Sequence, residues 1–123
     1  MPPLCASYGT FAMTVSYFVR YCGPNRDDGA FVARYRDVHV PLLLDFPGIR
    51  SVVLRTPLAV ADRFAVVPAG TRLLAEMRFD DRAALEAALA SPARARARED
   101  FARMPAFDGT IAHEALAEQV YRR

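Results

Sequence analysis

His39 is the side chain in this sequence best suited to chemistry near neutral pH. An imidazole has an ordinary pKa near ~6.5, so it can accept or donate a proton in that range. Tyr35 lies one helical turn earlier and offers a phenolic O–H, so the two could act as general base and proton donor on a small substrate. Each also has a structural alternative. His39 could be a buried side chain bonded to a backbone carbonyl, and Tyr35 could be a core residue.

Four further side chains could line a cavity beside His39 and bind a substrate. Tyr17 and Tyr21 alternate onto one side of a predicted strand, although packing in the core or in a dimer is the favoured explanation for them. Phe31 and Leu42 share the apolar helix face that carries His39. We therefore predict catalytic roles for His39 and Tyr35, and substrate-binding roles for Phe31, Leu42, Tyr17 and Tyr21.

The arginines favour surface roles. An inward-facing arginine on a strand could bind a carboxylate or enolate with its planar fork, but solvated or edge positions are expected for Arg55, Arg72 and Arg78. A second run spans both sides of a predicted helix and is balanced by Glu99 and Asp100. We predict that this run forms a solvated face; its members are Arg94, Arg96 and Arg98.

Other kinds of site lack their usual residues. The chain has only two histidines, far apart, and no Cys/His cluster, so we predict no metal site. No glycine-rich nucleotide loop, nucleophile elbow or CxxC pair is present, so we predict no cofactor. His113 and Glu114 are neighbours on a predicted strand and point to opposite faces, so they do not form a dyad.

Composition limits the class of protein. The 123 residues correspond to one domain, and a net charge of +2 gives no electrostatic case for nucleic acid. All 16 basic residues are arginine, which we interpret as a compositional bias. No segment approaches the ~20 apolar residues of a membrane span. Two cysteines are too few for a disulfide framework, so we expect a cytoplasmic protein. The hydrophobic fraction of 53% is slightly high and predicts an interface, a pocket or a doubly covered strand.

The elements that must position these residues follow from periodicity and turn residues. We expect residues 1–12 to be a disordered extension and 13–123 to be the domain. Strands are predicted over 13–22, 49–56 and 71–79, and helices over 80–90 and from Ser91 to about Arg103. A further helix begins after Asp27 or Asp28 and is expected to kink at 38–41, where Pro41 biases Val40 away from helical angles. Residues 110–121 have helix propensity but alternate like a strand.

Three short segments resemble the EthD-like family. They are the aromatic run Phe31–Tyr35, the His-x-Pro-Leu element at His39–Leu42, and the Pro-Gly turn at Phe46–Ile49. Weaker matches lie in the last third of the chain, at Ser91-Pro92, Asp100-Phe101 and Phe107-Asp108-Gly109. The resemblance extends from about Met13 to Tyr121.

The resemblance implies the fold and narrows the function. It implies a ferredoxin-like α+β domain, βαββαβ, whose four-stranded antiparallel sheet pairs with a second copy as a dimeric α+β barrel. Residues 110–121 are then a strand. It also implies a small cofactor-independent enzyme that moves a proton on an aromatic, polyketide-like or lactone substrate, as an isomerase, cyclase, decarboxylase or oxygenase. The alternatives are a non-catalytic accessory or ligand-binding barrel of a degradation pathway, and a bare scaffolding dimer without a pocket.

Overall fold

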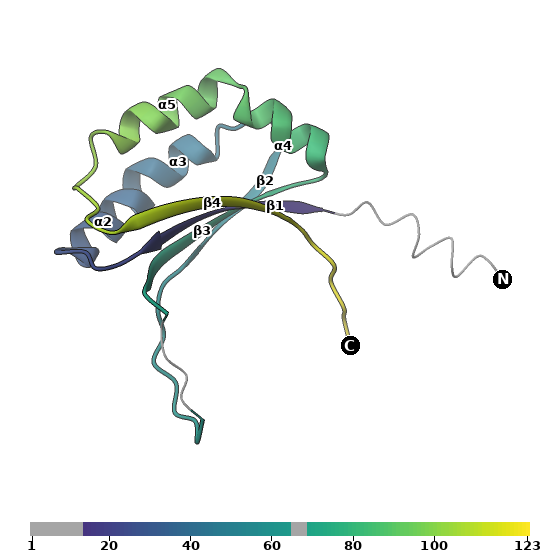
Figure 1. Cartoon of the computed structure of the whole chain (residues 1–123). Helices are drawn as coiled ribbons and strands as arrows, with labels where there is room; N and C mark the ends of the chain where they lie inside the picture. The colour runs from purple at the N-terminus through teal and green to yellow at the C-terminus, as the bar shows by residue number, and fades with distance from the viewer. Residues whose placement is uncertain (1–13, 65–68) are drawn as a thin grey trace.

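The computed structural model describes residues 14–64 and 69–123, so the disordered extension expected over 1–12 lies outside the described residues. Four strands form one antiparallel sheet in the order β2-β3-β1-β4. All the described helices lie on one face of this sheet, and no described element covers the other face, which is called the uncovered face below (Figure 1). The fold is therefore the predicted ferredoxin-like α+β arrangement. The strands are β1 (Val15–Cys22), β2 (Ile49–Arg55), β3 (Thr71–Phe79) and β4 (Thr110–Ala117).

The central strands divide their side chains between the two faces. Tyr17, Val19 and Tyr21 of β1 are buried beneath the helices. The alternate residues of β1 lie on the uncovered face, where Ser16 bonds to Glu76 of β3. Glu76 also pairs with Arg55, so this face carries a charged group as well as apolar side chains.

The segment predicted as a strand over 110–121 does form a strand in spite of its helix propensity, but β4 ends at Ala117. It pairs antiparallel with β1, from Val15 opposite Ala117 to Cys22 opposite Thr110. β1 would otherwise be an edge strand with unpaired N–H and C=O groups, and pairing satisfies them. Tertiary hydrogen bonding therefore outweighs local propensity here.

The first helical segment is continuous and contains one wide turn. Its parts are α2 (Asp28–Arg34), the π-helical turn η1 (Tyr35–His39) and α3 (Val40–Leu43). The carboxylate of Asp27 caps the first turn by accepting from the N–H of Ala30 at 2.9 Å. The expected departure of Val40 from helical angles is wrong, because its φ and ψ are −56° and −45°.

The π turn explains how Pro41 fits within this helix. The N–H of Val40 bonds to the carbonyl of Tyr35, five residues back, so the hydrogen-bonding pattern has shifted before Pro41 is reached. Pro41 then falls in the first turn of α3, where its missing N–H costs little. The helix widens at 35–39 in place of the expected kink.

Two capped helices complete the layer. Asp81 caps α4 (Arg82–Leu89) through the N–H of Ala84, and Ser91 caps α5 (Pro92–Phe101). The helices predicted over 80–90 and from Ser91 are thereby confirmed, the first with Asp81 as its cap. The core lies between the helices and the sheet, and includes Leu73, Ala75, Met77 and Phe79 of β3. Within 14–64 and 69–123, no helix is long and apolar enough to cross a membrane.

Candidate functional site: a cavity between α5 and the sheet

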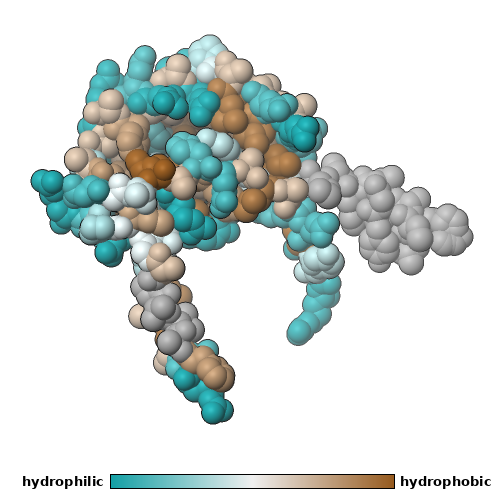
Figure 2. Space-filling view, in the orientation of Figure 1, coloured by the Kyte–Doolittle hydropathy of each residue, from teal (hydrophilic) through white to brown (hydrophobic). Residues whose placement is uncertain are grey.

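A cavity of about 260 Å³ lies between the sheet and the helical layer. Figure 2 shows hydrophobic residues gathered between α5 and β4, where these two elements flank it. The sheet contributes Tyr17, Val19, Tyr21, Met77, Ile111 and His113. The first helical segment and its following turn contribute Tyr35, His39, Leu43 and Phe46. Helices α4 and α5 contribute Leu89, Arg94, Ala97, Arg98 and Phe101.

His39 is held by a carboxylate on the neighbouring helix. Its Nδ1 lies 3.0 Å from Oδ2 of Asp100, and both side chains are buried. The other carboxylate oxygen of Asp100 accepts from the guanidinium of Arg34 at 2.5 Å. Burial raises the pKa of the Asp100 carboxyl, but the hydrogen bonds from His39 and Arg34 outweigh it and bring the pKa below its ordinary value. Asp100 is therefore a carboxylate that fixes the orientation of the imidazole.

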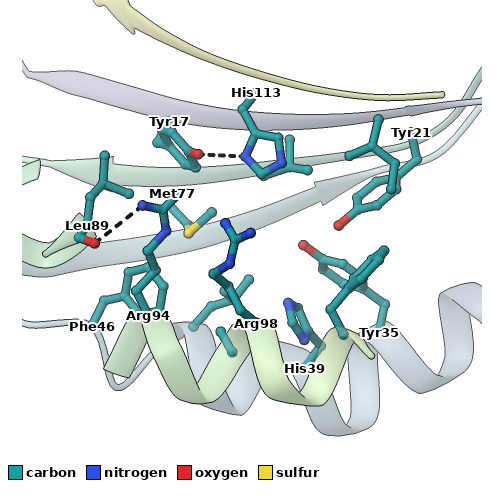
Figure 3. A pocket seen from close by; sticks show the side chains of 15 residues that line it. Tyr17, Tyr21, Tyr35, His39, Phe46, Met77, Leu89, Arg94, Arg98 and His113 are labelled. Carbon is teal, nitrogen blue, oxygen red and sulfur yellow. Dashed lines mark hydrogen bonds between the residues drawn. The ribbon is translucent and has the colours of Figure 1, made fainter. Parts of the chain in front are cut away.

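The other nitrogen of His39 is available to a ligand. No hydrogen bond to Nε2 is present among the residues that the structure describes. The ring packs against Tyr35, with centroids 4.6 Å apart, and its edge lies near Phe101. In Figure 3 the imidazole lies at the cavity floor beside Tyr35. This arrangement differs from the structural alternative of a histidine bonded to a backbone carbonyl.

Two tyrosines meet next to His39. The rings of Tyr21 and Tyr35 are 5.5 Å apart, edge to face, and Figure 3 shows their hydroxyl groups pointing toward each other. Burial raises the pKa of Tyr21 to about 12, and burial also raises the pKa of Tyr35 well above its ordinary value. Both groups are therefore neutral phenols at neutral pH, suited to donating a hydrogen bond and unsuited to acting as bases.

A second hydrogen-bonded histidine, His113, lies across the cavity from His39, on the sheet, and pairs with Tyr17. The hydroxyl of Tyr17 is 2.6 Å from Nδ1 of His113. Partial burial lowers the pKa of His113, and the positive charges of Arg94 and Arg98 lower it further. His113 is therefore a neutral imidazole near pH 7.

Four of the six residues predicted for the site come together in the cavity: Tyr17, Tyr21, Tyr35 and His39. Phe31 and Leu42 do not line it. Phe31 is a core residue, 1% exposed, whose ring packs against Tyr21 and Phe107. Leu42 is half-buried against the core. Phe31 does share a helix face with His39, but it lies two turns earlier along the helix. Its ring is therefore buried behind the cavity wall.

Several residues of the cavity were not predicted. Arg94, Arg96 and Arg98 were expected in a solvated face, and Arg96 and Arg98 are exposed. Arg94 and Arg98 nevertheless also line the cavity, and so does His113. Their spacing held a signal, since Arg94, Arg98 and Phe101 recur at helical intervals on one side of α5. The position of Asp100 could also have been predicted from helical spacing, because it continues the buried stripe of Ala93 and Ala97. The strand arginines Arg55 and Arg78 pair with Glu76 on the uncovered face, away from the cavity.

No metal-binding cluster is found among residues 14–64 and 69–123: no three or more His, Cys, Asp or Glu side chains are grouped to hold an ion. The cavity contains two imidazoles, but they occupy opposite walls and each has its own partner.

Comparison with known proteins identifies the family. The model of the EthD domain matches residues 23–108 of the chain. The chain belongs to the EthD family. An EthD family protein from Bacillus halodurans has the same fold, with a TM-score of 0.67 at 22% identity, covering 87% of this chain and 100% of that one. The comparison with curated proteins finds no match to this EthD family chain.

Two oxygenases of lower identity share the fold. SnoaB, a cofactor-independent oxygenase from Streptomyces nogalater, matches with a TM-score of 0.58 and 16% identity, over 89% of this chain and 97% of its own. A monooxygenase from ActVA-Orf6 of Streptomyces coelicolor, in complex with Nanaomycin D, matches with a TM-score of 0.61 and 13% identity, over 91% and 92%. The EthD family chain thus shares its fold with a cofactor-independent oxygenase and with a monooxygenase.

Proposed function

We propose that this EthD family protein is a small cofactor-independent enzyme that transfers a proton on a small aromatic, polyketide-like or lactone substrate. The observation that carries the proposal is the His39–Asp100 pair at the cavity floor. A carboxylate at Nδ1 keeps the proton on that nitrogen, and Nε2 then has a free lone pair facing the ligand space. The fold shared with SnoaB and with the ActVA-Orf6 monooxygenase supports a role in small-molecule chemistry.

The proposed step is removal of a proton from a carbon next to a carbonyl group. The lone pair on Nε2 of His39 takes the proton, and the electrons of the C–H bond move onto the carbonyl oxygen to form an enolate. Tyr35 lies beside the imidazole and, as a neutral phenol, donates a hydrogen bond to a substrate oxygen. Isomerisation, cyclisation, decarboxylation or reaction with oxygen could each follow from this enolate. Asp100 acts as a positioning residue.

Deuterium exchange tests the proposal without knowledge of the natural substrate. Small bicyclic ketones and lactones, such as 2-tetralone, are incubated with the protein in D₂O, and loss of the α-proton is followed by NMR. We expect the protein to accelerate exchange, and His39→Gln to lose at least about 100-fold of that acceleration. His39→Gln must keep the unfolding temperature and near-UV spectrum of the wild type. A folded His39→Gln protein with the full exchange rate would contradict the proposal.

A non-catalytic ligand-binding barrel is the second candidate. The observation that favours it is the 5% exposure of His39, which is packed between the rings of Tyr35 and Phe101 as a structural histidine would be. This candidate predicts that ligands bind in the cavity and that none of them exchanges its α-proton. The exchange experiment therefore separates the two candidates.

We also propose that the protein acts as a homodimer, paired through the uncovered face of its sheet. Leu116 of β4 lies on that face with 49% of its surface exposed. Described parts of the β2–β3 connection and of the C-terminal segment extend beyond the same face (Figure 1), and carry the exposed side chains Phe64 and Tyr121. Contact with a second copy would remove this apolar surface from water. The cytoplasmic location stays a prediction.

A further inference from the structure

The helical side of the cavity, which also carries His39, has two arginines. Arg94 and Arg98 are one turn apart on α5, and both line the cavity. Figure 3 shows the guanidinium of Arg98 directed from α5 toward His113 on β4. The side chain of Arg94 reaches the carbonyl of Leu89, 3.4 Å away, which leaves most of its donors unused.

No carboxylate balances these two arginines among the described residues. Seven other arginines pair with Asp or Glu side chains, for example Arg34 with Asp100 and Arg55 with Glu76, whereas Arg94 and Arg98 have no such partner there. None of the described residues that line the cavity is an Asp or Glu. The local excess of positive charge is therefore open to a ligand.

His113 adds a neutral hydrogen-bond donor from the sheet side of the cavity, facing Arg98. A phenol is a stronger acid than a neutral imidazole N–H, so we assign the Tyr17 hydroxyl as donor to Nδ1 across their 2.6 Å contact. The remaining proton of His113 is then on Nε2. In Figure 3 this nitrogen is turned into the cavity, toward Arg98.

We propose that Arg98, Arg94 and His113 form an oxyanion-binding subsite, and that the natural ligand is a small aromatic acid whose carboxylate or ionised hydroxyl binds there. This inference deepens the proposed function and rests on it for the cavity being the ligand site. The planar fork of an arginine matches two oxygens of such a group. The opposite end of the ligand would then lie next to His39.

The apolar part of the cavity fits one or two flat rings. Tyr21 and Phe101 are nearly parallel, with ring centroids 6.1 Å apart, and Met77 and Ile111 complete the apolar lining. The volume of about 260 Å³ is at the small end for ligand pockets, which favours a compact bicyclic molecule over an extended chain.

A pair of isosteric probes tests the subsite. Binding of 1-naphthoate and of neutral 1-naphthamide is measured by calorimetry at pH 7.5 and low salt. We expect 1-naphthoate to bind at least about 10-fold more tightly, as a charge-assisted contact predicts, and to lose this advantage in high salt. Arg98→Met should remove most of the difference by weakening naphthoate alone. Arg96→Met, on the exposed side of the same helix, is the matched control and should leave both affinities unchanged.

Three results would overturn the inference, and they differ in what else they overturn. Equal binding of the acid and the amide would eliminate the oxyanion subsite and leave the cavity as a ligand site. Failure of both probes to bind, with folded protein, would argue against the subsite and against the proposed function together. If Arg98→Met and Arg96→Met weakened naphthoate equally, the effect would come from net charge and not from the cavity.

Discussion

Nδ1 of His39 and Oδ2 of Asp100 lie 3.0 Å apart although 61 residues separate them in the chain. The contact joins the π-helical turn η1 to the last turn of α5, and its carboxylate also holds Arg34. Because of this contact, Nδ1 of His39 is held by a hydrogen bond, and Nε2 is free to face a ligand. Loss of the contact should therefore affect catalysis more than ligand binding.

Asp100→Asn should slow the exchange reaction at least about 100-fold, because an amide does not enforce the required imidazole tautomer. As Asp100 positions His39 and does not touch the substrate, kcat should fall while KM stays nearly constant. Nitrogen NMR of the His39 ring should show a changed tautomer, a readout that a purely structural role would not move. Asp37→Asn, an exposed carboxylate paired with Arg36, is the control and should leave rate and spectrum unchanged.

His113 should make stability depend on pH below neutrality. Burial, together with the charges of Arg94 and Arg98, lowers its pKa in the folded protein, whereas the unfolded chain titrates near ~6.5. Just below that pH the unfolded chain binds more protons, so stability falls as pH decreases. Urea unfolding at pH 7.5 and pH 5 should show a smaller decrease for His113→Gln than for the wild type. An equal decrease in both would contradict the neutral state of His113.

Because of Tyr21, the folded protein should become less stable at alkaline pH. Burial raises the pKa of Tyr21 to about 12, so the unfolded chain releases this proton first, near ~10. The contribution of neutral Tyr21 to the free energy of unfolding is complete below pH ~10 and is lost as the pH rises above that value. Tyr21→Phe should lose less stability than the wild type between pH 9 and 11, measured by urea unfolding. Tyr121→Phe, at an exposed position, should behave as the wild type does.

Phe31 should matter for folding and not for ligand specificity. Its ring is 1% exposed in an aromatic cluster with Tyr21 and Phe107, so Phe31→Ala should cost about 3–5 kcal/mol of unfolding free energy. Leu42→Ala should cost less, since Leu42 is only partly buried. The folded fraction of either variant should keep the preference for 1-naphthoate over 1-naphthamide. A reversed preference would show that Phe31 contacts the ligand.

Leu116→Glu should convert the proposed dimer to a monomer, because it places a charge on the uncovered face of the sheet. Size-exclusion chromatography with light scattering gives the mass in solution. Ala87→Glu, at an exposed position of α4, is the matched control and should remain dimeric. A monomeric wild-type protein would contradict the proposal.

Much of the fold could be predicted from local patterns. β-Branched and aromatic composition predicted β1, and alternation predicted β3. The capping residues Asp27 and Ser91 predicted two helix starts, because these signals act over a few residues. Local reasoning was wrong at Val40, where the preference for non-helical angles before proline gave way to a π turn. It was undecided over 110–117, which became a strand because β1 needed a hydrogen-bonding partner.

The sequence by itself determined which residue types could do chemistry and on which side of their own element they lie. Tyr17 and Tyr21 share a strand face, and Tyr35 and His39 share a helix face, since each period is short and local. Only the tertiary structure decided which faces meet. The pairing of His39 with Asp100, and of Tyr17 with His113 across 96 residues, depends on how α5 and β4 pack against the rest of the fold. The same packing placed the half-buried Arg94 and the exposed Arg98 along the cavity, because only the packing of α5 against the sheet decides which of its charged sides faces the cavity.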